Sequence, residues 1–197
     1  MNNILEAKAL SQLFTGARTF NAFLDREVPD ELIKEIYELM KWAPTSMNCQ
    51  PGHYLVVKSP ESKALLNTAL VSGNQQKSLA APATVIVAYD TQFHNNLPML
   101  FPAYPNAKDM FESNKSFRID TAFRNSSLQG AYFILAARSL GLDCGPMSGF
   151  DNKRVDETFF PDGRYKSNFL INIGYGDATK NYPRGPRLEF SDAVAIL

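Results

Sequence analysis

Charge of one sign, long apolar runs and metal-binding residues are all scarce in this chain. Among 197 residues, 20 lysines and arginines balance 20 aspartates and glutamates. The chain therefore lacks the basic surplus that attracts a nucleic-acid backbone. The longest apolar runs, such as 132–137 and 85–89, are far shorter than the ~20 residues of a membrane-spanning helix. We expect neither a nucleic-acid partner nor a membrane span.

Cysteine and histidine are rare as well. Cys49 and Cys144 lie far apart in the sequence, and the two histidines, His53 and His94, form no metal-binding pattern such as HExxH. No charged-then-apolar leader opens the sequence. These absences predict reduced thiols, no metal site and a cytoplasmic location.

Two common catalytic loops are also missing. The stretch 174–179 (GYGDAT) begins like a dinucleotide fingerprint but ends in threonine where glycine is needed. The stretch 145–149 (GPMSG) misses the GxSxG nucleophile elbow by one position. His53, at the head of an expected strand, fits a structural histidine better than a catalytic one. The sequence thus favours neither a Rossmann nucleotide domain nor a Ser-His-Asp hydrolase.

The composition is that of one packed domain. Hydrophobic residues make up 45%, aromatics 12% and charged residues 20%, which are values typical of globular proteins. A compact chain of this length buries roughly 70% of its unfolded surface. With no internal repeat or low-complexity tract, residues 1–197 are expected to form a single domain.

Hydrophobic periodicity predicts helices around a few short strands. Helices are expected at about 29–40, 60–70, 117–140 and 152–159. Strands are expected at 53–58, 83–89 and 168–174. This order favours an α+β layered fold with a small central sheet flanked by helices.

Local signals refine these elements. Gly141 should end the longest helix in a left-handed cap, and Asp151 should cap the last one. The lone tryptophan, Trp42, ends an apolar helix face and is expected in the core. Residues 91–116 carry Pro98, Pro102 and Pro105 and show no period, so we expect an irregular excursion that covers a site or a subunit boundary.

Five short polar clusters are not demanded by core packing. They are 17–21 (ARTFN), 44–51 (PTSMNCQP), 74–77 (NQQK), 146–151 (PMSGFD) and 184–188 (RGPRL). Each alone fits a turn, a tight loop or a solvated helix end. Together they offer neutral hydrogen-bond donors, one ammonium group and arginines near both ends of the chain. That set suits a flat heteroaromatic ligand with a phosphate tail.

In this order and spacing the clusters resemble the FMN-dependent nitroreductase family over nearly the whole chain. Four tracts look closest to the malonic semialdehyde reductases of bacterial pyrimidine degradation: 41–49 (KWAPTSMNC), 122–127 (AFRNSS), 145–151 (GPMSGFD) and 170–177 (LINIGYGD). The resemblance implies a nitroreductase-like intertwined homodimer with FMN at each subunit interface. It also implies NADPH or NADH as the reductant, with nothing in the sequence to select between them.

The resemblance assigns roles to individual residues. Arg18 and Thr19 match the segment that contacts the FMN phosphate, and Asn21 stands where the family usually places lysine or arginine near the flavin ring. Asn74 and Lys77 match the pair at the flavin edge. The remaining matches are Pro44, Thr45, Ser46 and Asn48, which in the family reach the partner's FMN; Met147, Ser148 and Gly149, whose backbone faces flavin N5 and O4; and Arg184 and Arg187, either of which could hold the phosphate.

Lys77 is the predicted catalytic residue, because a cation beside the flavin N1/C2=O edge stabilises the charge that reduction creates there. The flavin carries the redox chemistry, which explains the shortage of histidines. The implied reaction is ping-pong hydride transfer from NAD(P)H through flavin N5 to malonic semialdehyde. A broad nitroreductase or quinone reductase on the same scaffold is the main alternative, and a non-catalytic flavin-binding dimer is another. Lys115, Arg118 and Arg124 are candidate partners for the substrate carboxylate, and the sequence alone does not rank them.

Overall fold

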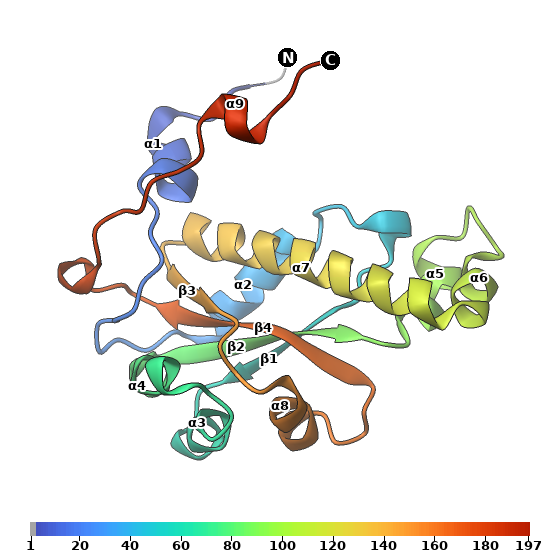
Figure 1. Ribbon diagram of the computed structural model, residues 1–197, viewed down its shortest axis with the longest axis horizontal. Helices are drawn as coiled ribbons and strands as arrows, with labels where there is room; N and C mark the ends of the chain where they lie inside the picture. The colour runs from blue at the N-terminus through green and yellow to red at the C-terminus, as the bar shows by residue number, and fades with distance from the viewer. Residues whose placement is uncertain (1–2) are drawn as a thin grey trace.

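A computed structural model describes residues 3–197 and shows a four-stranded antiparallel sheet between two layers of helices (Figure 1). The strands are β1 (Gly52–Val57), β2 (Ala83–Asp90), β3 (Asp143–Met147) and β4 (Tyr165–Gly174). They pair in the order β1-β2-β4-β3. The α+β class with a small central sheet is therefore confirmed.

Helices cover both faces of the sheet. The elements α2 (Asp30–Met40) and α7 (Lys115–Ser139) pack on one face, and α3 (Pro60–Asn67), α4 (Ser72–Ala80) and α8 (Asn152–Phe159) lie on the other (Figure 1). The shorter helices are α1 (Ala7–Leu10), α5 (Leu97–Leu100), α6 (Ala107–Ser113) and α9 (Phe190–Ala193). Single turns are η1 (Ser11–Thr15), η2 (Ser46–Asn48), η3 (Phe93–Asn96) and η4 (Ala178–Lys180).

The two central strands, β2 and β4, are buried on both faces because each alternate set of side chains packs into its own core. Val85 and Ile171 contribute to the core under α7, together with Phe133 of that helix. Ile86 and Leu170 contribute to the core under α3 and α8. The sheet thus lies between two apolar cores, one on each of its faces.

Most predicted elements are confirmed, with boundaries that move by a few residues. The helix expected over 60–70 ends at Asn67. Gly141 adopts φ +82° after α7, and its N–H donates to the carbonyl oxygen of Arg138 at 3.0 Å. The Asp151 side chain accepts from the backbone N–H of Arg154 at 3.1 Å. Both predicted caps are therefore correct.

Three predictions about local structure were wrong. The tract 145–147, expected as part of a loop, belongs to β3, where Pro146 is tolerated because β3 lies at the edge of the sheet. The tract 74–77, for which a solvated helix end was one interpretation, lies within α4, and its Asn74 is buried. The excursion 91–116 contains the short helices η3, α5 and α6 instead of irregular chain.

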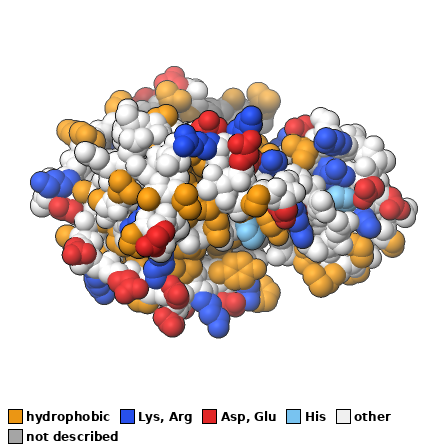
Figure 2. Space-filling view, turned by 90° about the horizontal axis from the view of Figure 1, so that it is seen from below, with side chains coloured by type: hydrophobic (Ala, Val, Ile, Leu, Met, Phe, Trp, Pro, Cys, Tyr) orange, Lys and Arg blue, Asp and Glu red, His pale blue; other side chains and the backbone are white. Residues whose placement is uncertain are grey.

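Apolar side chains are exposed on several parts of this single chain. Trp42, expected in the core, is 82% exposed and lies just beyond the end of α2 at Met40. The segments around α1 and α9 project away from the body (Figure 1) and expose Phe14, Leu188 and Phe190. On the face shown in Figure 2, acidic and basic side chains are interspersed without a field of one sign. No helix within residues 3–197 has the length and apolarity needed to cross a membrane.

Candidate functional site

The segment after η1 runs along the outer edge of β3 and places three predicted residues there. Thr19 forms a parallel bridge with Cys144, and the Phe20 N–H donates to the Cys144 carbonyl oxygen at 3.0 Å. A Cβ at position 145 would overlap the carbonyl oxygen of Phe20, so this close approach requires Gly145. Arg18, Thr19 and Asn21 are consequently fixed relative to the sheet.

Three arginines, Arg18, Arg184 and Arg187, meet at a cavity of about 210 Å³ that is also lined by Thr19 and Asn21. One guanidinium nitrogen of Arg184 donates to the carbonyl oxygens of residues 15 and 17 at 2.9 and 3.0 Å. Arg187 donates to the carbonyl oxygens of residues 185 and 186, both at 2.9 Å. Clustered guanidinium groups suit a phosphate, whose oxygens accept in the same planar geometry.

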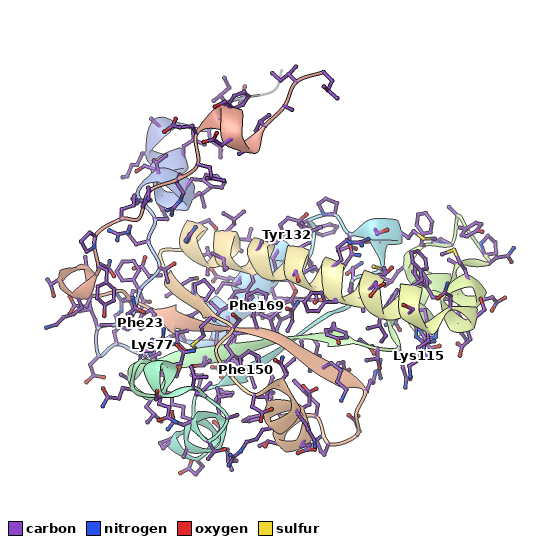
Figure 3. The ribbon with its side chains drawn as sticks, in the orientation of Figure 1. Phe23, Lys77, Lys115, Tyr132, Phe150 and Phe169 are labelled. Carbon is purple, nitrogen blue, oxygen red and sulfur yellow. The ribbon has the colours of Figure 1, made fainter. Side chains whose placement is uncertain are left out.

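A second group of predicted residues lies beside this cavity. The Nζ of Lys77 donates to Oδ1 of Asn21 at 3.4 Å, and the Nδ2 of Asn74 donates to the Gly149 carbonyl oxygen at 2.9 Å. A Cβ at position 149 would lie 2.7 Å from Asn74 Nδ2 and 2.8 Å from Val71 Cγ2, so any larger residue would displace the Asn74 or Val71 side chain. The arrangement joins α4 to the loop after β3, with Lys77 near Phe23 at one end of the sheet (Figure 3).

The adjoining residues complete this part of the site. Met147 is buried at the end of β3, and Ser148 is exposed in the loop that follows. Asn74 is 9% exposed, which corrects the interpretation of its cluster as solvated. The structure thus brings together Arg18, Thr19, Asn21, Asn74, Lys77, Met147, Ser148, Gly149, Arg184 and Arg187.

The tract 44–48 forms a separate and strained turn. Met47 and Asn48 have φ of 51° and 49°, and Gln50 has φ of 40°, although none of them is glycine. Such backbone costs of order 1–3 kcal/mol per residue and is often found at ligand sites. The Thr45 hydroxyl accepts from the Gln50 N–H at 3.2 Å.

This turn is attached to the middle of α7. The Ser46 N–H donates to Oδ1 of Asn125 at 2.9 Å, and the Tyr132 hydroxyl donates to the Pro44 carbonyl oxygen at 3.1 Å. The Asn48 side chain donates to the carbonyl oxygen of Leu100, in α5, at 2.9 Å. Within residues 3–197 no hydrogen bond links this turn to the group around Lys77. One chain therefore carries two groups of predicted residues that it does not itself bring together.

Sequence analysis missed two polar residues beneath α4, Thr84 and Asn172. Both are fully buried, and the Thr84 hydroxyl donates to Oδ1 of Asn172 at 2.7 Å. The sequence feature that could have revealed this pair is Asn172, which interrupts the apolar run of the last strand. Asn125 was likewise noted only within a motif, whereas it is buried and holds the strained turn.

The other reactive side chains do not form a second catalytic centre. Burial raises the pKa of Cys49 to about 11 and that of Cys144 to about 12, so both free thiols are protonated at neutral pH. His53 stacks on Tyr165 with ring centroids 3.9 Å apart, and burial lowers its pKa. Among the described residues, no three histidine, cysteine, aspartate or glutamate side chains are grouped to hold a metal ion.

Comparison with known proteins identifies relatives of the whole chain. The family model described as "Nitroreductase family" matches residues 15–175. A protein of Rhodopseudomonas palustris, provisionally named NADH dehydrogenase/NAD(P)H nitroreductase, is 54% identical over 197 residues, which is 100% of both chains. A protein of Stenotrophomonas maltophilia with the same provisional name is 53% identical over 196 residues, again covering 100% of both.

Solved structures share the fold at lower sequence identity. A provisionally assigned nitroreductase of Bacillus subtilis superposes with a TM-score of 0.85 at 24% identity, covering 98% of this chain and 100% of that one. Another from Exiguobacterium sibiricum, solved in complex with FMN, has a TM-score of 0.86 at 23% identity and covers 100% of both chains. These likenesses confirm the expected layered fold.

Proposed function

Because the chain belongs to the nitroreductase family, we propose that it is a cytoplasmic, FMN-dependent NAD(P)H oxidoreductase that acts on malonic semialdehyde. The main support for FMN as the cofactor is one observation. Arg18, Arg184 and Arg187 line a single cavity, directly beside the contact between Lys77 and Asn21. An FMN needs a phosphate site and a cation near its ring, and these groups supply both. The provisional names of the 54% and 53% identical relatives support NAD(P)H as the reductant.

The donor set fits FMN by its chemistry. FMN supplies the hydride chemistry, with N5 as the atom that accepts and donates. Arg18 and Arg187 would hold the phosphate, with Arg187 giving up its bonds to the carbonyl oxygens of residues 185 and 186, while Arg184 anchors the backbone at residues 15 and 17. Lys77 would stabilise negative charge on the ring edge, and Gly149, which has no side chain, would leave the reacting face open.

We propose a homodimer because one chain carries only part of each site. The turn 44–48 lies against α7 and α5, away from Lys77. In a symmetric dimer this turn from one copy would complete the site of the other. The exposed apolar side chains of Trp42, Phe123 and the α9 segment supply the surface that such an interface buries.

Purified protein is expected to be yellow, to contain about one FMN per chain and to migrate as a dimer. Stopped-flow mixing with NADPH or NADH should bleach the flavin absorbance, and an electrophilic acceptor should restore it. A flavin-binding dimer without catalytic function would bind FMN but would not bleach. Colourless, monomeric protein that ignores added FMN would rule out the cofactor assignment.

The substrate proposal requires a cation that can meet a carboxylate. Arg118 is half-buried and already lies 3.4 Å from both the Phe111 carbonyl oxygen and His94 Nε2. Lys115 and Arg124 are exposed on α7, and Lys115 is at the opposite end of the molecule from Lys77 (Figure 3). Arg124 is adjacent to Asn125, which holds the turn 44–48. In the proposed dimer, Lys115 and Arg124 would therefore act on the site of the second copy, as that turn does.

The second candidate function is a broad nitroreductase or quinone reductase. The provisional names of the relatives favour it, and an open flavin face reduces many electrophiles, so the fold does not select a substrate. The two functions differ in whether a cation recognises the substrate carboxylate.

Malonic semialdehyde is expected to be reduced to 3-hydroxypropanoate with a kcat/KM roughly thirtyfold above that of propanal. Pairing a carboxylate with a partly desolvated cation contributes ~2 kcal/mol, which corresponds to that ratio. Steady-state kinetics with the semialdehyde, propanal and a nitroaromatic compound would measure it. Equal kcat/KM values for the two aldehydes, or a far higher kcat/KM for the nitroaromatic compound, would contradict the assignment of malonic semialdehyde as substrate. The assignment as a flavin reductase would still stand.

A further inference from the structure

Two polar side chains interrupt the apolar interior of the sheet directly beneath α4. Thr84 on β2 and Asn172 on β4 are register partners, and both are 0% exposed. Their neighbours along the strands, Ile86 and Leu170, face the apolar core on the same side. A threonine–asparagine pair at this position is unexpected, because burying polar groups is costly unless they are hydrogen-bonded.

The pair is bonded to the helix that carries Lys77. Asn172 Oδ1 accepts from Thr84 Oγ1 at 2.7 Å, which orients the Asn172 amide so that its Nδ2 faces α4. That Nδ2 lies 3.3 Å from Ser78 Oγ and 3.4 Å from the Lys77 carbonyl oxygen. Ser78 in turn donates to Met147 Sδ at 3.7 Å.

This network connects all the elements that hold the flavin-edge residues. Thr84 and Asn172 belong to the two central strands, Ser78 to α4 and Met147 to the end of β3. Lys77 and Ser78 are adjacent, so the two bonds from Asn172 fix the last turn of α4 against the sheet. Met147 leads directly into the loop that contains Gly149, which Asn74 holds from the same helix.

The network contributes orientation more than stability. Replacing both members of a buried hydrogen-bonded pair with apolar groups of the same shape is nearly neutral, whereas removing only one leaves an unpaired polar atom. An apolar pair would therefore serve the core as well. What it would not supply is a directional contact to the Lys77 backbone.

We propose that Asn172 is a positioning residue, oriented by Thr84, that fixes the Lys77 ammonium and the Met147–Gly149 backbone relative to each other. This inference rests on the proposed FMN site. A charge stabilises reduced flavin most when it is held at one place, since preorganisation avoids reorientation during the reaction. Loosening the network should therefore change the midpoint potential of the flavin more than the stability of the fold.

The test is the double variant T84V/N172L, whose side chains keep the shapes of the originals. The apoprotein should unfold within a few degrees of wild type. The preference for reduced over oxidised flavin should fall about tenfold, which lowers the two-electron midpoint potential by about 30 mV. Ser167→Ala is the matched control. Ser167 is a buried polar residue on the same strand as Asn172, but its hydroxyl accepts from Asn152 of α8 instead of facing α4. The flavin potential of this variant should equal that of wild type.

A double-mutant cycle separates this role from a general effect on the core. In the Lys77→Ala background, T84V/N172L should shift the potential clearly less than it does in the wild-type background, because the part of the effect that acts through Lys77 is already lost. An unchanged potential in T84V/N172L, or the same shift with and without Lys77, would overturn the proposal. If T84V/N172L does not fold, Ser78→Ala decides in its place, with an expected shift of the same sign and no shift as the contrary result. Failure of wild-type protein to bind FMN would instead contradict the proposed function.

Discussion

Replacing Lys77 with alanine is expected to lower the flavin midpoint potential and slow turnover about 100-fold without changing the oligomeric state. In the proposed site the ammonium group would stabilise the negative charge that reduction places on the flavin edge, and removal of one such preorganised group typically costs 10²–10³ in rate. The contact with Asn21 at 3.4 Å holds Lys77 beside the arginine cavity. A spectroelectrochemical titration and stopped-flow reduction by NAD(P)H would measure the two effects.

Two variants control for that experiment. Lys77→Arg keeps the charge and should recover part of the potential. Lys153→Ala removes an exposed lysine of α8, outside the candidate site, and should behave as wild type. If Lys77→Ala keeps both the wild-type potential and the wild-type rate, Lys77 is only a solvated charge.

Combined removal of Arg18 and Arg187 is expected to weaken FMN binding about 100-fold or more, with little change in potential. Each charge-assisted hydrogen bond to a phosphate contributes ~1.5–3 kcal/mol. The phosphate carries the same charge in both redox states of the cofactor, so loss of the arginine contacts should weaken the binding of both states equally. Equilibrium dialysis or fluorescence titration of the apoprotein with FMN would give the dissociation constant.

The single variants distinguish the two C-terminal arginines. Arg187→Ala should raise only the FMN dissociation constant. Arg184→Ala should also loosen the segment before Arg18, since its guanidinium holds the carbonyl oxygens of Thr15 and Ala17. Arg154→Ala, an exposed position on α8, is the control. Equal losses of potential from Arg187→Ala and Lys77→Ala would show that this division between phosphate and ring contacts is wrong.

Elements with a strong local signal were predictable. The helix over 117–140 has a long apolar pattern and a glycine stop, and the structure gives α7 with Gly141 in the left-handed conformation. Strand β3 had no such signal, because Gly145 and Pro146 are typical of loops. Its pairing with β4 and with the segment at Thr19 makes it a strand, and those partners are distant in sequence.

The exposure of Trp42 has a similar cause. A tryptophan after an apolar helix face is usually buried in its own chain. Here the face of α2 carries Ile36 and Met40 into the core, and the chain turns away before residue 42. Periodicity describes which side of a helix is apolar, but it does not say where the helix ends relative to the sheet.

By itself, the sequence determined the layered class, most helices and strands, and the identity of the polar clusters, since these depend on short-range patterns and residue chemistry. Only the tertiary structure decided which clusters meet. Long-range contacts place Arg18 beside Arg184 and Lys77 beside Asn21, and they hold the turn at 44–48 on α7. They also pair Thr84 with Asn172 beneath α4. Such contacts join residues far apart in the chain, and they arise from strand register and close packing, which local sequence patterns do not encode.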